Sequence, residues 1–374
     1  MNDIRCRKDI TLTEQEKALF TVHLEQQGLC NNVWDIFGEW VARSTSRISF
    51  FYLKVFMDNE LAGLGLFLKI NPYDLRSSYA WLRSGTILSR MAGSLSALSS
   101  NCVYISFRNL ITSNLTRPFF YREPAMANDI MKAILAYLKN EKEADMVIIV
   151  DTTIHDDTYQ VEEFVKYPCP SEAWLDATRY NDISEYLSEH RSLKKNLSRR
   201  KKAVESEVRQ GLLSDADKAQ MKACIECSAE NSKVTLPFQQ FFEENIFETE
   251  VFNSDGYVHV LVRVDGTIAG FHTFQVSGSN MGGVVGGFNR DYSRKSFAYE
   301  RVIVASLDYA IKNNIKRVSY SLIDNHTKLR LVNSLDPCGL YFYSRNPMNR
   351  KVFDLTSKYG DIYQLYLLEK QGGN

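Results

Sequence analysis

One pattern of apolar and polar positions occurs twice along the chain. Residues 55–67 read VFMDNELAGLGLF and residues 262–274 read VRVDGTIAGFHTF, so Val, Asp, Ala, Gly and Phe recur at the same steps, 207 residues apart. Apolar runs flank a central pair in each copy, Asp58-Asn59 and Asp265-Gly266. Such pairs favour a hairpin turn because Asn and Gly tolerate a positive φ. The pattern predicts two β-hairpins of one design, and hence two copies of one module.

The segments after each hairpin repeat one order of elements. In the first copy these are a strand-like segment at 102–107, an amphipathic helix at 127–142 and a strand at 146–150 that is apolar on both faces. In the second copy they are a glycine-rich strand at 281–288, a helix at 297–313 and a strand at 318–322. Helix and last strand recur 173 residues apart, which implies an insertion of 34 residues in the first copy.

Two further helices are expected, one near the start and one between the copies. Thr13 and Glu16 have the spacing of a capping box, in which two residues satisfy each other's backbone N–H groups. Residues 183–210 are predicted as one helix ending before Gly211, and the segment 191–202 carries seven basic residues in twelve and no acidic one. The predicted domains are residues 1–170, and residues 171–374 including the basic helix 183–210.

Composition restricts the class of protein. A chain of 374 residues with 44% apolar and 24% charged residues suits two globular domains. Lys plus Arg equals Asp plus Glu at 45 each, so binding to nucleic acid or membrane would need a local patch. The first residues lack the apolar core of a signal peptide, and no apolar run nears the ~20 residues of a membrane helix. With seven scattered cysteines, we expect a cytoplasmic protein that binds neither membrane nor DNA.

A hairpin, a glycine-rich strand, a helix and a strand in this order resemble the second part of a GNAT-type acyltransferase. Two such modules joined by a basic helix resemble the FemABX and BioF2-like branch of that superfamily. The resemblance rests on the basic segment 191–202, the hairpin at 265–270, and the strand and loop at 320–328. It implies an α/β fold of two GNAT-like modules (the acyl-CoA N-acyltransferase fold) with mixed central sheets flanked by helices.

The resemblance also implies an activity. The family transfers acyl or aminoacyl groups, so the donor would be an acyl-thioester or an aminoacyl-tRNA and the acceptor a small-molecule or peptide amine. Acyl-CoA or aminoacyl-tRNA would be a co-substrate, no cofactor would be bound permanently, and no metal would be needed.

One segment departs from the family. GNAT enzymes that hold coenzyme A usually show Arg/Gln-x-x-Gly-x-Gly/Ala where the helix after the glycine-rich strand begins, and backbone N–H groups there bind pyrophosphate. This chain has RDYSRKSFA at 290–298, a predicted loop with two adjacent cations and no glycine. The departure disfavours ordinary coenzyme A binding and favours a donor held by side chains.

Acyl transfer to an amine needs a base, a group that stabilises the oxyanion by positive charge or hydrogen bonds, and aligned substrates. The family places a lysine shortly after its last strand, and Lys328 matches that position, on a predicted loop. Lys328 is the candidate for stabilising the oxyanion or a substrate anion, and Asp324 and His326 are candidates for the base. The plainer interpretations are a solvated surface lysine and an Asp that only forms a turn.

The basic segment lacks acidic i,i+4 partners, so its charges repel one another unless an anion such as a nucleotide diphosphate, phosphate or tRNA is near. A solvated helix face is the alternative. The candidate donor-binding residues are Arg199, Arg200, Arg294, Lys295 and Ser296. The candidate walls of a substrate cleft are Phe288, Asn289, Tyr292 and Tyr299, although aromatic residues beside a sheet more often belong to the core.

Other motifs give weaker signals. Cys224 and Cys227 form a lone Cys-x-x-Cys on a predicted helix, whereas a zinc site would need a second pair. The glycine pairs at 282–283 and 286–287 indicate either a close approach of a ligand or a bulge.

The sequence therefore predicts an N-acyltransferase or aminoacyltransferase whose second module holds the better-preserved site. The cleft between the modules would bind the acceptor. The rival prediction is a non-catalytic ligand-binding protein on a degenerate GNAT-like fold, which the missing glycine loop favours. A third prediction is an aminoacyltransferase whose donor group is carried by tRNA, and only the basic helix supports it.

Overall fold

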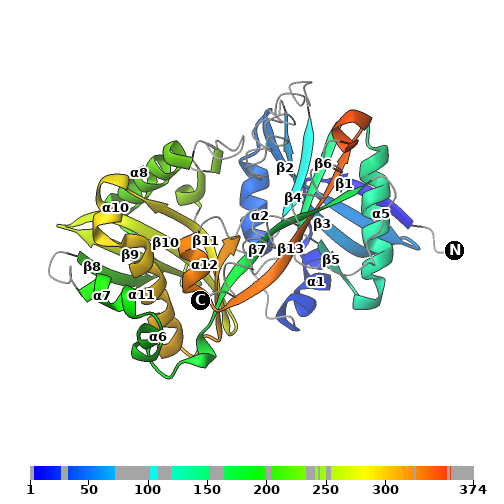
Figure 1. Cartoon of the computed structure of the whole chain (residues 1–374). Coiled ribbons are helices and arrows are strands. Elements are labelled where there is room, and N and C mark those ends of the chain that lie inside the picture. The colour runs from blue at the N-terminus through cyan, green and yellow to red at the C-terminus, as the bar shows by residue number, and fades with distance from the viewer. Residues whose placement is uncertain are drawn as a thin grey trace.

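The protein has two halves of similar construction that meet along a shared set of strands (Figure 1). The structure is a computed structural model and describes residues 4–26, 33–71, 102–107, 119–151, 164–198, 204–232, 241–242, 245–249, 254–322, 326–351 and 354.

The first half runs from β1 to β7. Its elements are β1 (Ile4–Asp9), α1 (Glu14–Gln26), α2 (Val33–Ala42), β2 (Ile48–Met57), β3 (Glu60–Ile70), β4 (Val103–Phe107), β5 (Phe119–Tyr121), the 3-10 turn η1 (Pro124–Met126), α5 (Ala127–Asn140), β6 (Met146–Asp151) and β7 (Val165–Asp176).

The second half runs from η4 to β13. Its elements are η4 (Ala177–Arg179), α6 (Ile183–Glu189), α7 (Arg191–Ser198), β8 (Val204–Gln210), α8 (Asp215–Ser232), η5 (Ile246–Glu248), β9 (Tyr257–Val264), β10 (Thr267–Ser277), β11 (Asn280–Phe288), α10 (Arg290–Ser296), α11 (Ala298–Lys312), β12 (Arg317–Leu322), α12 (His326–Leu331) and β13 (Ser334–Ser344).

The two predicted hairpins are equivalent down to single residues. Asp58, Asn59, Asp265 and Gly266 all have positive φ, so both turns are of the type that matches the twist of the strands. The pairing register of each hairpin shifts at the same step. In the first hairpin the shift follows the pair Val55 and Gly63, and in the second it follows the equivalent pair Val262 and Gly270. One β-bulge in both copies confirms the predicted duplication.

The outer edges of the sheet repeat as well. In β1, Ile4 pairs with Met57, and in β8 Val204 pairs with Val264, the equivalent hairpin position. A capping box follows each edge strand. The predicted one is confirmed, because Thr13 N donates to Glu16 Oε2 at 2.8 Å and Glu16 N donates to Thr13 Oγ1 at 3.2 Å. At α8, Asp217 N donates to the Ser214 hydroxyl oxygen at 3.1 Å.

The acid of each capping box is also bound by a cation from the adjacent sheet. Lys54, only 2% exposed, lies 2.7 Å from Glu16 Oε1 and 3.2 Å from Asp9 Oδ2. In the second half Arg263 Nη2 lies 2.5 Å from Asp217 Oδ1. Burial opposes ionisation of Glu16 and Asp217, but these hydrogen bonds outweigh it and lower the pKa of both carboxyls. The helix that follows each edge strand, α1 after β1 and α8 after β8, is therefore fastened to the sheet by an ion pair.

The halves exchange their last strands. Within the described residues the strands form one sheet in the order β1-β2-β3-β4-β6-β13-β7-β12-β11-β10-β9-β8, with β5 beside β3. β7, the last strand of the first half, pairs with β12 of the second. β13, the last strand of the second half, pairs with β6 of the first. The predicted boundary at 170/171 falls inside β7, and the division into two domains stays a prediction.

The apolar cores follow this arrangement. One cluster lies between α5 and the first half of the sheet, and a second lies between α11 and the second half. The largest cluster joins α1 and α2 to α8 and to residues of β9 and β10. At this junction Trp40 stacks on Phe242 at 5.7 Å, and Arg43 donates to the Glu248 carbonyl oxygen at 2.8 Å. None of the described helices is long and apolar enough to cross a membrane.

Two predicted elements need correction. Residues 183–210 are not one helix: α6 and α7 are helical, whereas 204–210 form the edge strand β8. Gly211, with φ of 80°, ends that strand rather than a helix. The predicted loop 290–298 contains the helix α10. The other predicted elements are present. The helix predicted at 297–313 spans Ala298–Lys312, and Asn314 just after it is left-handed.

Equivalent glycines let the long helix of each half approach its hairpin. A Cβ on Gly63 would overlap the Ile130 side chain of α5, and one on Gly270 would overlap the Phe288 ring and lie 3.1 Å from Ala298 Cβ. Ile130 is β-branched and buried, whereas Phe288 is half-buried.

We expect Gly63→Ala to destabilise the protein by about 1–3 kcal/mol through overpacking, and Gly270→Ala by less. The control is Gly38→Ala in α2, where no described atom lies within 4 Å of the new methyl group. Because alanine favours the helix, the control should gain about 0.5–1 kcal/mol. Thermal unfolding followed by circular dichroism measures all three. Equal midpoints for Gly63→Ala and Gly38→Ala would contradict the close approach of α5.

Candidate active site

The central feature of the second half is a separation of two parallel strands. β11 and β12 pair at only three positions, ending at Gly282 and Ser319, although β11 continues to Phe288 and β12 to Leu322. In the first half, β4 pairs with β6 along all five of its residues. Of the described strands, only β11 and β12 therefore diverge in this way. Diverging strands leave main-chain groups that a ligand can pair with. We call this gap the splay.

The backbone of β12 changes direction at the splay. Its register with β7 shifts between Ser319 and Leu322, and Ser321 has a φ of 62°, in the left-handed region that few residues other than Gly, Asn and Asp adopt. The Ser321 backbone N–H donates to the Ser319 hydroxyl oxygen at 3.2 Å. Such strain is commonly found at functional sites.

An imidazole lies across β11 beside the splay. A Cβ on Gly283 would be 2.7 Å from His272 Nε2, and one on Gly286 would be 2.7 Å from His272 Nδ1, so these glycines make room for the ring. The ring stacks on Phe274 at 4.5 Å. Its Nε2 atom is enclosed and has no hydrogen-bond partner among the described residues. Desolvation, and then the charge of Lys328, lower the pKa of His272 to about 3, so the ring is neutral near pH 7.

Two buried charged residues lie near the same strands. Lys328 of α12 is 7% exposed, and its charge reaches His272. Glu172 of β7 is 2% exposed, and its Oε1 accepts a hydrogen bond from the Ser319 hydroxyl at 2.9 Å. Ionic side chains are seldom this buried unless they are paired or functional. Lys328 is therefore not a solvated surface lysine, and it lies on a short helix rather than on the predicted loop.

The other predicted catalytic residues are only partly visible. Asp324 lies outside the described residues. His326 begins α12, and nothing of its side chain is described. Sequence reasoning missed His272, Glu172 and Ser319. For His272 a signal existed, because the equivalent residue of the first hairpin is Gly65.

The predicted donor-binding residues surround the start of α11. Arg199 and Arg200 lie outside the described residues, but α7 leads to them. Arg301 connects α7 to this corner, because it donates to the Leu197 carbonyl oxygen at 3.0 Å and to the Ser296 carbonyl oxygen at 2.9 Å. Ser296 is buried, and its hydroxyl donates to the Tyr292 carbonyl oxygen at 2.8 Å.

The structure brings α7 together with α10, where Arg294 and Lys295 are exposed. The exposed cations of α7 are Arg191, Lys194 and Lys195.

The predicted cleft residues cluster where β11 meets α10 and α11. Asn289 caps α10 by accepting a hydrogen bond from the Asp291 backbone N–H at 3.0 Å. The rings of Phe288 and Tyr299 lie 5.4 Å apart and pack against the core under α11, and Tyr292 is exposed. No cluster of three or more metal-ligating side chains occurs in the described part of the chain.

Comparison with known proteins identifies the fold. No family model and no curated protein matches the sequence. Among solved structures, L-PGS from Bacillus licheniformis aligns over 94% of this chain and 97% of its own, with a TM-score of 0.55 and 11% identity. A tandem GNAT protein from the clavulanic acid biosynthesis pathway aligns over 92% and 99%, with a TM-score of 0.54 and 10% identity. FemX aligns over 93% and 100%, with a TM-score of 0.51 and 10% identity. The chain thus has the duplicated GNAT-like fold expected from its sequence.

The strained residue in β12 gives a test of the splay. We expect Ser321→Gly to raise stability by about 0.5–1 kcal/mol, because glycine adopts a φ of 62° without strain. Asn314→Gly is the control, and should change stability less because Asn already tolerates a φ of 57°. Thermal unfolding measures both. A loss of stability in Ser321→Gly alone would show that the native backbone there is not strained.

Proposed function

We propose that the chain is an N-acyltransferase that moves an acyl or aminoacyl group from an activated thioester or ester to an amine, with the reaction centred on the splay. The observation that carries the proposal is the buried Lys328, whose charge acts on His272 beside the separating strands β11 and β12. The tandem GNAT protein and FemX support the fold on which such chemistry would occur.

Lys328 would stabilise the developing oxyanion. Attack of an amine on a carbonyl carbon places negative charge on the carbonyl oxygen, and a fixed ammonium group stabilises that charge more strongly away from water. The main-chain groups freed by the splay would align the donor with the amine.

The general base that accepts the proton of the amine is assigned from pKa. A base works best when its pKa lies near the working pH. Since the pKa of His272 is lowered to about 3, His272 is a poor proton acceptor and is assigned a steric role at the splay. Asp324 and His326 therefore stay the proposed bases.

The donor would be held by side chains at the corner between α7 and α10. Both helices carry exposed cations, and Arg301 joins their ends by hydrogen bonds to the Leu197 and Ser296 carbonyl oxygens. α10 contributes no glycine that would let a pyrophosphate approach the backbone closely. This arrangement suits an anionic donor such as aminoacyl-tRNA or another phosphate-bearing carrier.

The first test concerns catalysis. Lys328→Ala should lower single-turnover transfer by a factor of ~100–1,000, and lower turnover more than acceptor affinity, because the charge matters most in the transition state. Lys316→Ala, an exposed lysine just before β12, is the matched control. Transfer from acetyl-coenzyme A or charged tRNA to a panel of amines is measured, with thermal unfolding as a check on folding. Equal rates for Lys328→Ala and Lys316→Ala would remove Lys328 from the mechanism, and tight donor binding without any transfer would favour the non-catalytic alternative.

The second test concerns the donor. A double charge reversal in α7, Lys194→Glu with Lys195→Glu, should weaken binding of bulk tRNA, and the affinity of the wild type should fall with added salt. Stability should change by less than ~1 kcal/mol, because both lysines are exposed. The double variant Lys132→Glu with Lys142→Glu, which reverses two exposed lysines of the first half, is the control for net charge. An unchanged dissociation constant in the double variant would make the basic segment a solvated helix face.

A further inference from the structure

One enclosed nitrogen atom beside the splay has no hydrogen-bond partner. It is Nε2 of His272, and this holds among all the described residues. His259 on the neighbouring strand β9 is satisfied, because its Nε2 lies 3.1 Å from the Gly211 carbonyl oxygen and its Nδ1 lies 2.9 Å from Thr273 Oγ1. A buried polar group without a partner is costly unless a ligand or water satisfies it.

The ring of His272 places this nitrogen where β11 leaves β12. Gly282 and Ser319 are the last paired residues of the two strands, and Gly283 is the next residue of β11. A Cβ on Gly283 would lie 2.7 Å from His272 Nε2 and 3.1 Å from the Ser319 carbonyl oxygen, so both atoms border the same small space. Nε2 therefore lies at the start of the splay.

Two aromatic side chains hold the imidazole in this orientation. The ring stacks on Phe274 at 4.5 Å, and the Tyr320 ring lies 6.3 Å away, nearly perpendicular to it. Tyr320 is fixed in turn, because its hydroxyl lies 2.6 Å from the Ser306 hydroxyl. A hydrogen-bonding group that is already held in place needs no reordering when a charge develops beside it.

The protonation state of the ring suits a hydrogen-bond donor better than a base. Burial and then the charge of Lys328 lower the pKa of His272 to about 3, so the imidazole is neutral near pH 7 and carries one N–H group. A neutral imidazole can polarise a carbonyl group by donating that hydrogen. Lys328, which is buried and acts on the ring through its charge, brings a cation to the same region.

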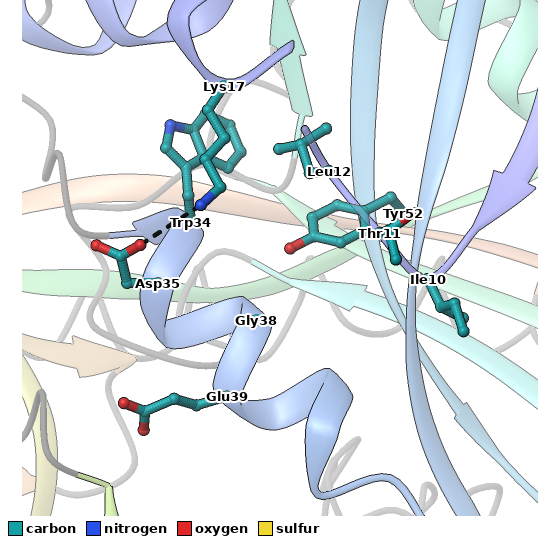
Figure 2. A pocket seen from close by; sticks show the side chains of 9 residues that line it. All are labelled: Ile10, Thr11, Leu12, Lys17, Trp34, Asp35, Gly38, Glu39 and Tyr52. Carbon is teal, nitrogen blue, oxygen red and sulfur yellow. Dashed lines mark ion pairs between the residues drawn. The ribbon is translucent and has the colours of Figure 1, made fainter. Parts of the chain in front are cut away.

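The first half has a different residue at the equivalent step. Gly65 stands there in place of His272, and a Cβ on Gly65 would lie 2.8 Å from the ring of Phe67. A groove of that half lies beside α2 instead, and Figure 2 shows its lining, in which Lys17 and Asp35 form an ion pair at 3.7 Å. The imidazole at the diverging strands is therefore a feature of the second half.

We propose that His272 is a further catalytic residue, which donates a hydrogen bond from Nε2 to the carbonyl oxygen of the acyl group and stabilises the oxyanion together with Lys328. The role rests on the proposed transfer reaction and is added to the steric role of the ring. The amine nitrogen bonds to the carbonyl carbon, and the bond from that carbon to the sulfur or oxygen of the carrier breaks. The carrier leaves with the proton that the amine loses, and His272 keeps its own proton throughout.

Three substitutions separate a hydrogen bond from a purely steric role. His272→Phe keeps a flat ring without an N–H group, His272→Gln places an amide N–H group at the reach of Nε2, and His272→Asn reaches only as far as Nδ1. We expect His272→Phe and His272→Asn to lower the single-turnover rate ~100-fold with unchanged acceptor affinity, and His272→Gln to lower it less than about tenfold. Thermal unfolding checks that each variant is folded. Wild-type rates in His272→Phe, or equal losses in His272→Phe and His272→Gln, would overturn the proposal.

Combined substitutions test whether the two side chains act on one oxygen atom. Lys328→Ala with His272→Phe should then lower the rate by less than the product of the two single losses, because either change alone already disturbs the oxyanion. Losses that multiply would place the two side chains at different atoms and refute the shared role.

Binding of acetate separates the role of His272 from the transfer reaction, since its carboxylate oxygen can occupy the place of the oxyanion. In protein labelled with ¹⁵N-histidine, which contains six histidines, the Nε2 resonance of His272 is the one missing from His272→Gln. Acetate should shift this resonance saturably at constant ionic strength, and methylammonium should not. A shift in a wild type that transfers nothing would support the hydrogen-bond site and reject the proposed reaction. An absent shift with full transfer in His272→Phe would reject the role of His272 alone, and an absent shift without any transfer would reject both.

Discussion

The exchange of the last strands is the constraint on which the rest of the structure depends. β7 leaves the first half and pairs with β12, so β12 has a neighbour on each side. After Ser319 the pairing with β11 stops, while β7 still holds Leu322 beyond a bulge. The same register shift that keeps β12 on β7 thus allows β12 to leave β11. In the first half β13 pairs with β6 without a shift, and β6 stays on β4. A bulge in one exchanged strand pair therefore accompanies the opening between β11 and β12.

Because the two halves have the same construction, equivalent residues of the two halves can be compared directly. The hairpin turns, the bulge, the edge-strand register and the capping boxes agree, so a difference between equivalent residues reports a local change on a constant frame. Gly65 has become His272 beside the splay, and Tyr52 stands where the second half has His259. The Nε2 atom of His272, which has no hydrogen-bond partner among the described residues, lies beside the splay, whereas both ring nitrogens of His259 contact polar atoms. The halves have therefore diverged at different places.

The features that could be predicted from the sequence were turns, helices and strands formed by residues close together in the chain. Two hairpins followed from Asp-Asn and Asp-Gly turns, the first helix from the Thr13 and Glu16 pair, and α5 and α11 from apolar periodicity. The segment 204–210 was misassigned because Gly211 also suits the end of a helix, and only pairing with β9 makes the segment a strand. The strand exchange depends on pairs of residues more than a hundred positions apart, and the splay lies between strands whose paired residues are 37 positions apart. No local pattern encodes either feature. Lys328 was found through a family motif, but its burial was not, since burial arises from packing.

Zero net charge conceals an uneven distribution of charge. The 45 cations and 45 anions cancel over the chain, yet α7 and α10, whose ends are joined by hydrogen bonds from Arg301, both carry exposed cations. The field of such exposed charges acts within about 10 Å at moderate salt. An anion near these two helices would therefore meet a positive potential, although the chain as a whole is neutral.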